Sequence, residues 1–192
     1  GQVFSYRGAS YAIPLLGEHQ LHNAATVLEA ISVLRKQGWD IDDEAVESGL
    51  YSVAWPARFE VLHTDDPWFV LDGGHNPQCA AALRECLEHY FPDSKRVALV
   101  GVLKDKDYKS IAATLAPLFD ACVCVTPPSE RALPAEELAE LFKGSCREVC
   151  VVDTVEDGVD LARDIAQEQD AMVCAFGSLY ICGQIRSCFG LR

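Results

Sequence analysis

The stretch Val70-Leu71-Asp72-Gly73-Gly74-His75-Asn76-Pro77 decides the fold that this sequence predicts. It begins as an apolar strand that ends at Asp72, and two glycines then let the backbone turn sharply and let a ligand come close. Asn76 is a favourable helix N-cap and Pro77 a favourable first helical residue, so a helix is expected to follow at once. The stretch therefore predicts a strand, a tight turn and a helix.

The same alternation of strands and helices continues outward from this stretch over residues 56–192. Strands are predicted at 59–63, 68–71, 96–102, 121–125, 148–152 and 171–176, with a turn at 64–67 between the first two. Helices are predicted at 76–90, 108–118, 134–142, 155–167 and 179–188. Apolar strands between helices imply an α/β fold, a mostly parallel sheet with helices on both faces.

The first 55 residues follow a different pattern. Two short strands at 2–7 and 11–16 precede a helix at about 21–36 and a short helix at about 42–51. Trp55-Pro56 then breaks the pattern. Because so few residues rarely form an independent core, we expect 1–55 to be the end of something larger and 56–192 to be a separate domain. A first residue other than Met fits a processed or truncated product.

The composition excludes several classes of function. The chain has 192 residues, with 16 Lys and Arg against 29 Asp and Glu, a net charge of −13. Such an acidic surface repels phosphate backbones and argues against a dedicated nucleic-acid binder, although a local phosphate site needs only a few cations and backbone N–H groups. No apolar run approaches the roughly 20 residues that cross a bilayer, and no signal peptide opens the chain. We expect a cytoplasmic protein with no membrane partner.

The nine cysteines do not indicate a metal site. None of their spacings is C-x-x-C, and most lie in apolar surroundings. We expect reduced, buried thiols that act as small core residues.

Polar residues follow several of the predicted strands. Asp72 can accept hydrogen bonds from a ribose or help to hold a metal, and His75 can donate to a developing negative charge or carry a proton. Lys106 lies in the loop 101–107, which should emerge at the same sheet edge, and Ser178 follows the last strand. This edge is the usual ligand location in open α/β sheets. A plain strand–turn–helix corner, a solvated charged loop and a helix cap remain the simpler explanations.

Two further candidates lie earlier in the chain. Asn23 ends the polar stretch 17–23 before or within the first turn of a helix, and Arg58 follows Trp55-Pro56, from where it could reach an anion. Surface roles remain open for both. The chain has neither G-x-x-x-x-G-K-[ST] nor G-x-G-x-x-G, so it lacks a P-loop and gives little support to a nicotinamide dinucleotide site.

Taken in order, five segments resemble the folylpolyglutamate synthase and dihydrofolate synthase family of the Mur-type ligases. The segments are Leu16-Gly17-Glu18-His19-Gln20-Leu21-His22-Asn23-Ala24, Trp55-Pro56-Ala57-Arg58-Phe59-Glu60, Leu71-Asp72-Gly73-Gly74-His75-Asn76-Pro77, Gly101-Val102-Leu103-Lys104-Asp105-Lys106-Asp107 and Gly177-Ser178-Leu179-Tyr180. The family usually has Gly in place of Ala57 and often Ala in place of Gly74. The resemblance implies that 56–192 is a Rossmann-like C-terminal domain and that 1–55 is the helical end of a central ATPase domain.

The activity that the resemblance implies is ATP-dependent, ADP-forming addition of L-glutamate to a folate through an acyl phosphate, with dihydropteroate as a further candidate acceptor. It implies that Asn23, Arg58 and Asp72 contact ATP. It places His75 close to the reacting phosphate and glutamate, which also makes His75 and Asp72 the catalytic candidates. Lys106 and Ser178 are implied in glutamate recognition.

The P-loop and the Mg²⁺ ligands lie upstream of this stretch in the family. We therefore expect no metal site in this chain, no ligase activity from the 192 residues alone, and a monomer. Two alternatives stay open: a Mur-type ligase for another carboxylate, such as a peptidoglycan precursor, and a non-catalytic Rossmann-like module that binds a nucleotide or a protein.

Overall fold

The computed structural model describes residues 1–191 except 64 and 66, so the turn predicted at 64–67 lies partly outside the described residues. The chain divides into two compact units, Gly1–Pro56 and Ala57–Arg192. Each unit has a hydrophobic core of its own. None of the helices within the described ranges is long and apolar enough to cross a membrane.

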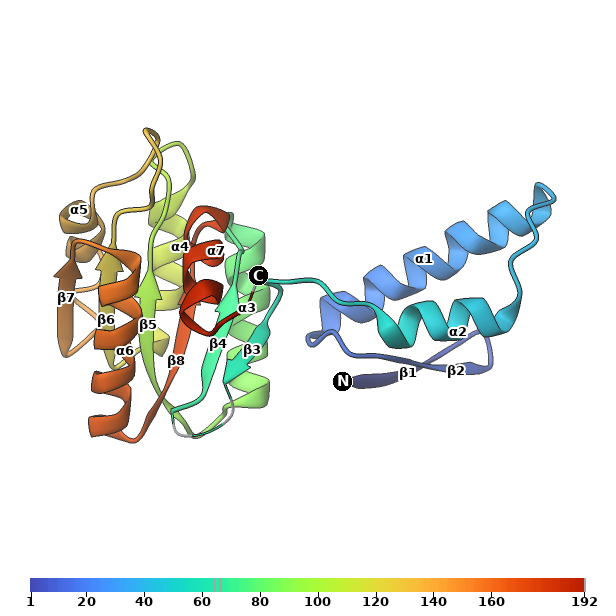
Figure 1. Ribbon diagram of the computed structural model, residues 1–192, viewed down its shortest axis with the longest axis horizontal. Coiled ribbons are helices and arrows are strands. Elements are labelled where there is room, and N and C mark those ends of the chain that lie inside the picture. Colours follow the sequence, from blue (N-terminus) through green and yellow to red (C-terminus); the bar gives the residue numbers. More distant parts are fainter. Residues whose placement is uncertain (64, 66, 192) are drawn as a thin grey trace. The chain divides into compact units, whose positions relative to one another are not determined.

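The first unit consists of an antiparallel hairpin and two helices (Figure 1). The elements are β1 (Gln2–Tyr6), β2 (Ala9–Ile13), α1 (Glu18–Lys36) and α2 (Asp43–Ser52). Strand β2 is shorter than predicted because Pro14, which follows it, has no N–H to donate. Helix α1 begins three residues earlier than predicted. The core of this unit is small, and its buried apolar residues are Ile13, Ala24, Leu28, Val46 and Leu50.

The second unit is built on a six-stranded sheet in the order β3-β4-β8-β5-β6-β7. The strands are β3 (Glu60–His63), β4 (Phe69–Asp72), β5 (Lys95–Val100), β6 (Ala121–Val125), β7 (Glu148–Val152) and β8 (Ala171–Phe176). All neighbours are parallel except β3 and β4, which are antiparallel, so the predicted mostly parallel sheet is confirmed. The last strand of the chain, β8, lies between β4 and β5.

Helices cover both faces of this sheet, as predicted (Figure 1). They are α3 (Pro77–Tyr90), α4 (Tyr108–Leu115) with the 3₁₀ turn η1 (Ala116–Leu118), α5 (Ala135–Glu140), α6 (Val155–Gln169) and α7 (Leu179–Cys188). Helices α6 and α7 pack on one face, where their apolar residues join those of the strands in one core. Strand β5 ends two residues before the predicted end because Val102 and Leu103 leave the sheet to pair with the segment around Ala132.

Gly158 allows helix α6 to lie directly on the sheet. A Cβ atom at this position would lie 2.8 Å from Val125 Cγ1 and 2.9 Å from Leu99 Cδ1, both in strands that are fully buried at these residues. Such distances are far inside van der Waals contact, so α6 or the strands would have to shift. The close approach therefore depends on the absence of a side chain.

We predict that Gly158→Ala lowers the free energy of unfolding by about 1–3 kcal/mol, because overpacking in a filled core displaces neighbouring side chains. Chemical denaturation of the chain measures this. Gly183→Ala in α7 is the matched control, since a Cβ there meets nothing within 4 Å. The control should be neutral or stabilising by up to about 1 kcal/mol through helix propensity. Equal stabilities of the two variants would contradict the packing argument.

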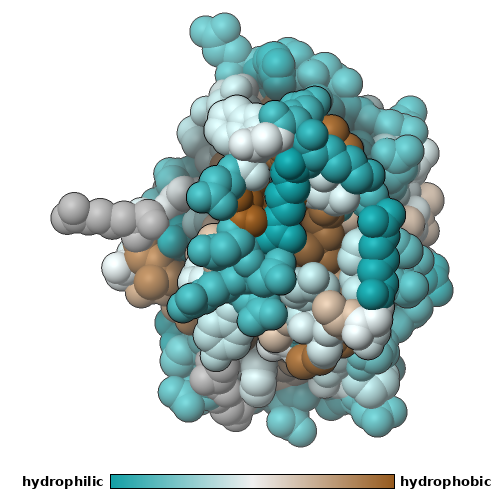
Figure 2. Space-filling model, turned by 90° about the vertical axis from the view of Figure 1, so that its right-hand side faces the viewer, coloured by the Kyte–Doolittle hydropathy of each residue, from teal (hydrophilic) through white to brown (hydrophobic). Residues whose placement is uncertain are grey.

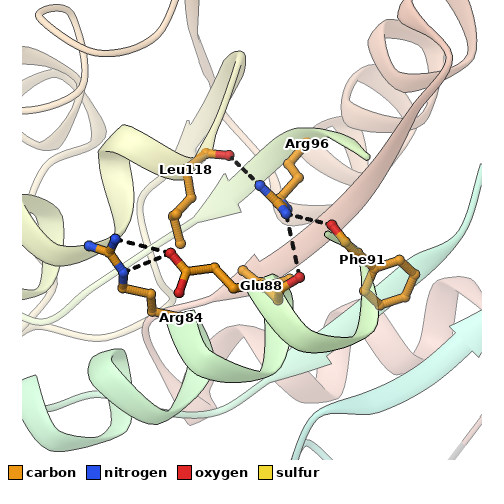
Figure 3. Close-up of polar contacts among 6 residues, drawn as sticks. Arg84, Glu88, Phe91, Arg96 and Leu118 are labelled. Atoms are coloured by element: carbon orange, nitrogen blue, oxygen red, sulfur yellow. Dashed lines mark hydrogen bonds and ion pairs between the residues drawn. The ribbon is translucent and has the colours of Figure 1, made fainter. Parts of the chain in front are cut away.

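Arg96 of strand β5 donates hydrogen bonds to the C-terminal ends of two helical segments (Figure 3). Its side chain is 9% exposed, and its guanidinium donates to the carbonyl oxygens of Leu118, Leu87 and Phe91. Carbonyl groups at helix ends lack partners within the helix and carry partial negative charge. The buried cation therefore offsets the partial negative charge at the ends of α3 and η1, where Leu87 O also accepts the Phe91 N–H at 3.0 Å and Phe91 O the Ser94 N–H at 3.4 Å.

We predict that Arg96→Met lowers the free energy of unfolding by about 2–4 kcal/mol, because one buried and two partly buried carbonyls lose a charged donor while the apolar stem is kept. Arg84→Met is the control, since Arg84 forms an exposed ion pair with Glu88 in the same helix, also drawn in Figure 3. Exposed pairs of this kind contribute about 0.3–0.5 kcal/mol. The prediction is wrong if denaturation shows that Arg96→Met and Arg84→Met lower the free energy of unfolding equally.

Candidate functional site

The carboxyl ends of three neighbouring strands bring the candidate residues of the second unit together. Asp72 at the end of β4 lies opposite Phe176 of β8, which lies opposite Val100 of β5. Gly101 N–H donates to the Phe176 carbonyl at 3.3 Å just beyond the last paired residues. The loops that follow β4, β8 and β5 therefore emerge side by side. The sequence predicted a shared edge for the loops after Asp72 and Val100, but not that the loop with Ser178 lies between them.

Asp72 uses both carboxylate oxygens to hold two turns together. Its side chain is 9% exposed, Oδ2 accepts the Phe59 N–H at 2.9 Å, and Oδ1 accepts the Gly74 N–H at 2.7 Å. Between them, Gly73 N–H donates to the Ala57 carbonyl at 2.8 Å. Hydrogen bonds to charged groups contribute about 1.5–3 kcal/mol each. Asp72 thus fixes the turn after β4 to the turn before β3.

The two glycines after Asp72 fit closely packed surroundings. A Cβ atom on Gly73 would lie 2.4 Å from Leu179 Cδ2, at the start of α7. A Cβ atom on Gly74 would lie 2.6 Å from Asp72 Oδ1 and 2.8 Å from Cys79 Cβ. The absence of side chains here lets the turn pass between α7 and α3 while it bonds to the carboxylate.

His75 stands beside the beginning of α3. Asn76 caps this helix, since its Oδ1 accepts the Cys79 N–H at 2.8 Å, as the sequence predicted. The half-buried imidazole of His75 has Nδ1 3.1 Å from the Gly73 carbonyl oxygen. Because a carbonyl only accepts, Nδ1 carries the hydrogen in this bond and Nε2 is left to accept a proton. The helix N-terminus next to it favours negative charge.

Ser178 is the N-cap of α7. It is 2% exposed, and its Oγ accepts the Tyr180 N–H at 3.2 Å. The hydroxyl therefore has a structural role at the strand end, and the next residue, Leu179, is half exposed at the same edge.

Lys106 belongs to a small group of charges beyond β5. Its Nζ lies 3.9 Å from Asp105 Oδ2, and Arg131 Nε lies 3.5 Å from Asp105 Oδ1. The loop after β6 reaches this group because Lys104 N–H donates to the Arg131 carbonyl at 2.8 Å. Sequence reasoning missed Arg131, although its place in the loop after β6 could have suggested it. Two cations thus lie within 4 Å of one carboxylate, and Lys106 is the one that the sequence predicted as a substrate contact.

Arg58 sits in a strained turn. The residues on either side, Ala57 and Phe59, have φ angles of 57° and 44°, and both are 3% exposed. Left-handed conformations cost roughly 1–2 kcal/mol in residues other than glycine. Arg58 itself is half-buried, and its Nη1 lies 3.5 Å from the Ala57 carbonyl oxygen. The turn is bonded to Asp72, so Arg58 belongs to the same edge.

Asn23 belongs to the first unit, Gly1–Pro56. It is exposed in the second turn of α1, and its Nδ2 donates to Gln20 Oε1 at 3.0 Å. The buried Gln20 thus orients an amide at the start of α1.

The first unit also contains an open hollow of about 510 Å³ between α1, α2 and the hairpin. Figure 2 shows one face of the molecule, on which hydrophilic residues predominate and apolar ones show in small patches between them. Ion pairs surround the hollow, with Arg7 bonded to Glu29 and Arg35 to Asp43. No candidate residue from the sequence lines this hollow.

The cysteines are all free thiols, and six of the nine are buried. The prediction of buried thiols is wrong for Cys188, which is exposed near the end of α7, where few elements cover it. Burial first, and the nearby Asp72 carboxylate second, raise the pKa of Cys86 and Cys182 to about 12. These thiols therefore stay neutral under the influence of the Asp72 carboxylate.

The comparison with protein families identifies this architecture. The model of the Mur ligase, glutamate ligase domain, matches residues 57–179, which is more than half of the chain. The chain belongs to the Mur ligase family. The match falls within the second unit and ends at Leu179, so this Mur ligase domain includes the whole strand edge described above.

Relatives of this Mur ligase domain confirm the resemblance found in the sequence. The chain is 34% identical over 213 residues to the dihydrofolate synthase/folylpolyglutamate synthase of Mycobacterium tuberculosis, covering 99% of this chain and 43% of that protein. The structure of M. tuberculosis folylpolyglutamate synthase complexed with ADP and AMPPCP has a TM-score of 0.86 and 31% identity, covering 96% of this chain and 43% of that one.

A second solved structure is a bifunctional folylpolyglutamate synthase/dihydrofolate synthase with Mn, AMPPNP and L-glutamate bound. Its TM-score is 0.73 at 29% identity, and it covers 97% of this chain and 44% of that one. The chain thus spans less than half the length of these relatives.

The raised pKa values of Cys86 and Cys182 predict that the free energy of unfolding depends on pH. In the unfolded chain these thiols ionise near the ordinary pKa of 9.0, whereas in the folded Mur ligase domain Cys86 and Cys182 keep their protons to about 12. The folded state therefore binds more protons between these values. The stability that the neutral thiols contribute is fully present below pH 9 and is lost as the pH rises towards 12, by up to about 1.4 kcal/mol per pH unit for each thiol.

Urea denaturation at pH values from 8 to about 11 measures this slope. Cys182→Ala should make the decline shallower than in the wild type, even if its stability at pH 8 is lower. A slope that Cys182→Ala leaves unchanged would show that this thiol does not carry the effect.

Proposed function

We propose that this chain contributes the glutamate ligase part of an ATP-dependent, ADP-forming ligase that joins L-glutamate to a folate. The observation that carries the proposal is the single strand edge at which the Asp72 turn, His75 at the start of α3 and the Ser178 loop meet. The ligands named for the related solved structures support it, since they are adenine nucleotides, manganese and L-glutamate.

In this proposal the ATP contacts come from Asn23, Arg58 and Asp72. The guanidinium of Arg58 supplies positive charge that offsets negative charge on the phosphates as the phosphoryl group moves. The main role of Asp72 is to accept backbone N–H groups, because its two oxygens hold the turns that carry Arg58 and His75. Its remaining acceptor capacity is available to a ribose hydroxyl.

The reaction proceeds in two steps. A carboxylate oxygen of the folate attacks the γ-phosphorus of ATP, and the bond from the γ-phosphorus to the bridging oxygen of the β-phosphate breaks. ADP is released, and the folate carboxylate has become an acyl phosphate. The amine of glutamate then attacks the acyl carbon, its extra proton goes to a base, and inorganic phosphate leaves. His75 suits this second step, because Nε2 can take up the proton while the N-terminus of α3 favours the developing oxyanion.

Recognition of glutamate is assigned to Lys106 and Ser178. The ammonium of Lys106, whose Nζ lies 3.9 Å from Asp105 Oδ2, is a cation that suits a carboxylate of the amino acid. Ser178 offers a hydroxyl at the N-terminus of α7, next to the same edge.

Magnesium is assigned to ligands outside these elements. Within the described residues no group of three His, Cys, Asp or Glu side chains could hold a metal ion. Mg²⁺ would accompany ATP and neutralise charge on its phosphates. The residues of this chain contribute the positive charge of Arg58 and the orientation of the substrates.

We further propose that 1–55 is the end of a central ATPase domain, with 56–192 as the separate ligase domain. The relatives, more than twice as long as this chain, support this organisation. On this view the 192 residues alone lack ligase activity, and the intact enzyme is a monomer in the cytoplasm.

The test is ADP release by the protein in the full length that its gene encodes, with folate, dihydropteroate or a UDP-sugar peptide as acceptor. We expect ADP release that requires both L-glutamate and a folate-type acceptor. His75→Ala should lower kcat by about tenfold or more, because it removes the proton acceptor. His89→Ala is the control, since His89 is exposed in the last turn of α3 and should leave kcat unchanged.

If only the UDP-sugar peptide supports ADP release, the acceptor is that of another Mur-type ligase and not a folate. Binding of nucleotide without any ligation would favour a non-catalytic module. Equal kcat values for the two histidine variants would remove His75 from the mechanism.

A further inference from the structure

The turn that carries Arg58 is strained on both sides. Among the described residues, four other than glycine have a positive φ, and two of these, Ala57 and Phe59, flank Arg58. Strained backbone of this kind persists only where surrounding contacts hold it, and it occurs often at functional sites. The contacts that hold the turn therefore decide how Arg58 is presented.

Three hydrogen bonds hold the two strained residues. Phe59 N–H donates to Asp72 Oδ2 at 2.9 Å, and the Ala57 carbonyl accepts from Gly73 N–H at 2.8 Å. On the other side, Ala57 N–H donates to Glu60 Oε2 at 2.8 Å. Asp72 thus holds one end of the turn and Glu60 the other.

Glu60 is itself held by helix α7. Its other oxygen, Oε1, accepts a hydrogen bond from Arg186 Nη1, and the two side chains are 23% and 13% exposed. In every other ion pair of the described ranges, both partners are at least 32% exposed. Solvent therefore screens the pair of Glu60 and Arg186 least.

Arg186 links the turn to the start of α7. Ser178, Cys182 and Arg186 follow one another at intervals of four residues, which places them along one side of the helix. Cys182 is 4% exposed, and its Sγ donates to the Ser178 carbonyl at 3.3 Å. Two turns of packed helix thus connect the cap at the strand edge to the ion pair.

Arg186 also engages a carboxylate near Arg58. Glu60 lies two residues from Arg58 in the chain, and both charges act on the Cys182 thiol. Among the described residues the only hydrogen bond of the Arg58 guanidinium is the 3.5 Å contact to the Ala57 carbonyl. With Glu60 engaged by Arg186 and by Ala57 N–H, the charge of Arg58 stays available to an anion.

We infer that Glu60 and Arg186 are positioning residues that hold the strained turn and keep the Arg58 guanidinium free for a phosphate group. The inference rests on the proposed function, in which the anion is ATP. Neither residue touches a substrate. Glu60 fixes the backbone of the turn, and Arg186 keeps Glu60 from neutralising Arg58.

The first experiment measures amide hydrogen exchange at Ala57 and Phe59 in this 192-residue chain by NMR. Glu60→Gln keeps the size of the side chain but removes the charge that binds Arg186. We expect exchange at Ala57 to be about tenfold faster or more in this variant, because the turn opens more often. Glu88→Gln is the matched control, since it breaks the exposed pair with Arg84 and should change neither amide.

The second experiment measures steady-state kinetics of the full-length protein. Glu60→Gln and Arg186→Met should each raise KM for ATP by about tenfold while kcat changes by less than about twofold, as expected for lost ground-state binding. Arg186→Lys keeps the charge but loses the planar fork, so an intermediate KM is expected. Glu88→Gln should match the wild type.

The outcomes distinguish a failure of the inference about Glu60 and Arg186 from a failure of the proposed function. Faster exchange together with a raised KM supports the inference, and an unchanged KM overturns it whether or not exchange becomes faster. If Glu60→Gln fails to fold, Arg186→Lys answers the same question with the charge preserved. A wild type without ATP-dependent ligation contradicts the proposed function, whereas the exchange of Ala57 still tests the role of Glu60 in the turn.

Discussion

The carboxylate of Asp72 is the contact on which the strand edge depends. It accepts one N–H from the turn before β3 and one from the turn after β4, and these segments are 13 residues apart in the chain. A buried carboxylate is costly unless its oxygens are satisfied, and backbone donors satisfy both. The position of Arg58 on one side and of His75 on the other follows from this one side chain. The thiols of Cys86 and Cys182 stay neutral and so add no second negative charge near Asp72.

The order of the strands explains why three loops share one site. Strand β8 lies between β4 and β5, so the loop with Ser178 emerges between the loop with His75 and the loop with Lys106. Ligand sites in parallel α/β sheets form at the carboxyl ends of strands, next to helix N-termini. Here α3 and α7 begin at this edge with side-chain caps, and both orient backbone N–H groups towards it.

Cations and carboxylates lie together at the strand edge of an acidic chain. The net charge is −13, yet Arg58, Lys106 and Arg131 follow strand ends or precede the first strand of the domain. A few cations at one edge of an acidic protein concentrate anionic ligands there, while the remaining surface repels polyanions. This distribution is suited to small phosphates and carboxylates and unsuited to nucleic acid.

The sequence by itself determined the elements and their caps. Apolar periodicity and local caps such as Asn76 act over a few residues, so the strands and helices could be predicted with small errors at their ends. Only the tertiary structure decided that β8 enters the middle of the sheet, that Phe59 bonds to Asp72, and that Glu60 pairs with Arg186, 126 residues away. Such contacts depend on which elements pack together, and no local pattern records a partner so distant in the chain. The strained angles of Ala57 and Phe59 have the same origin, because contacts from β4 and α7 impose them against local preference.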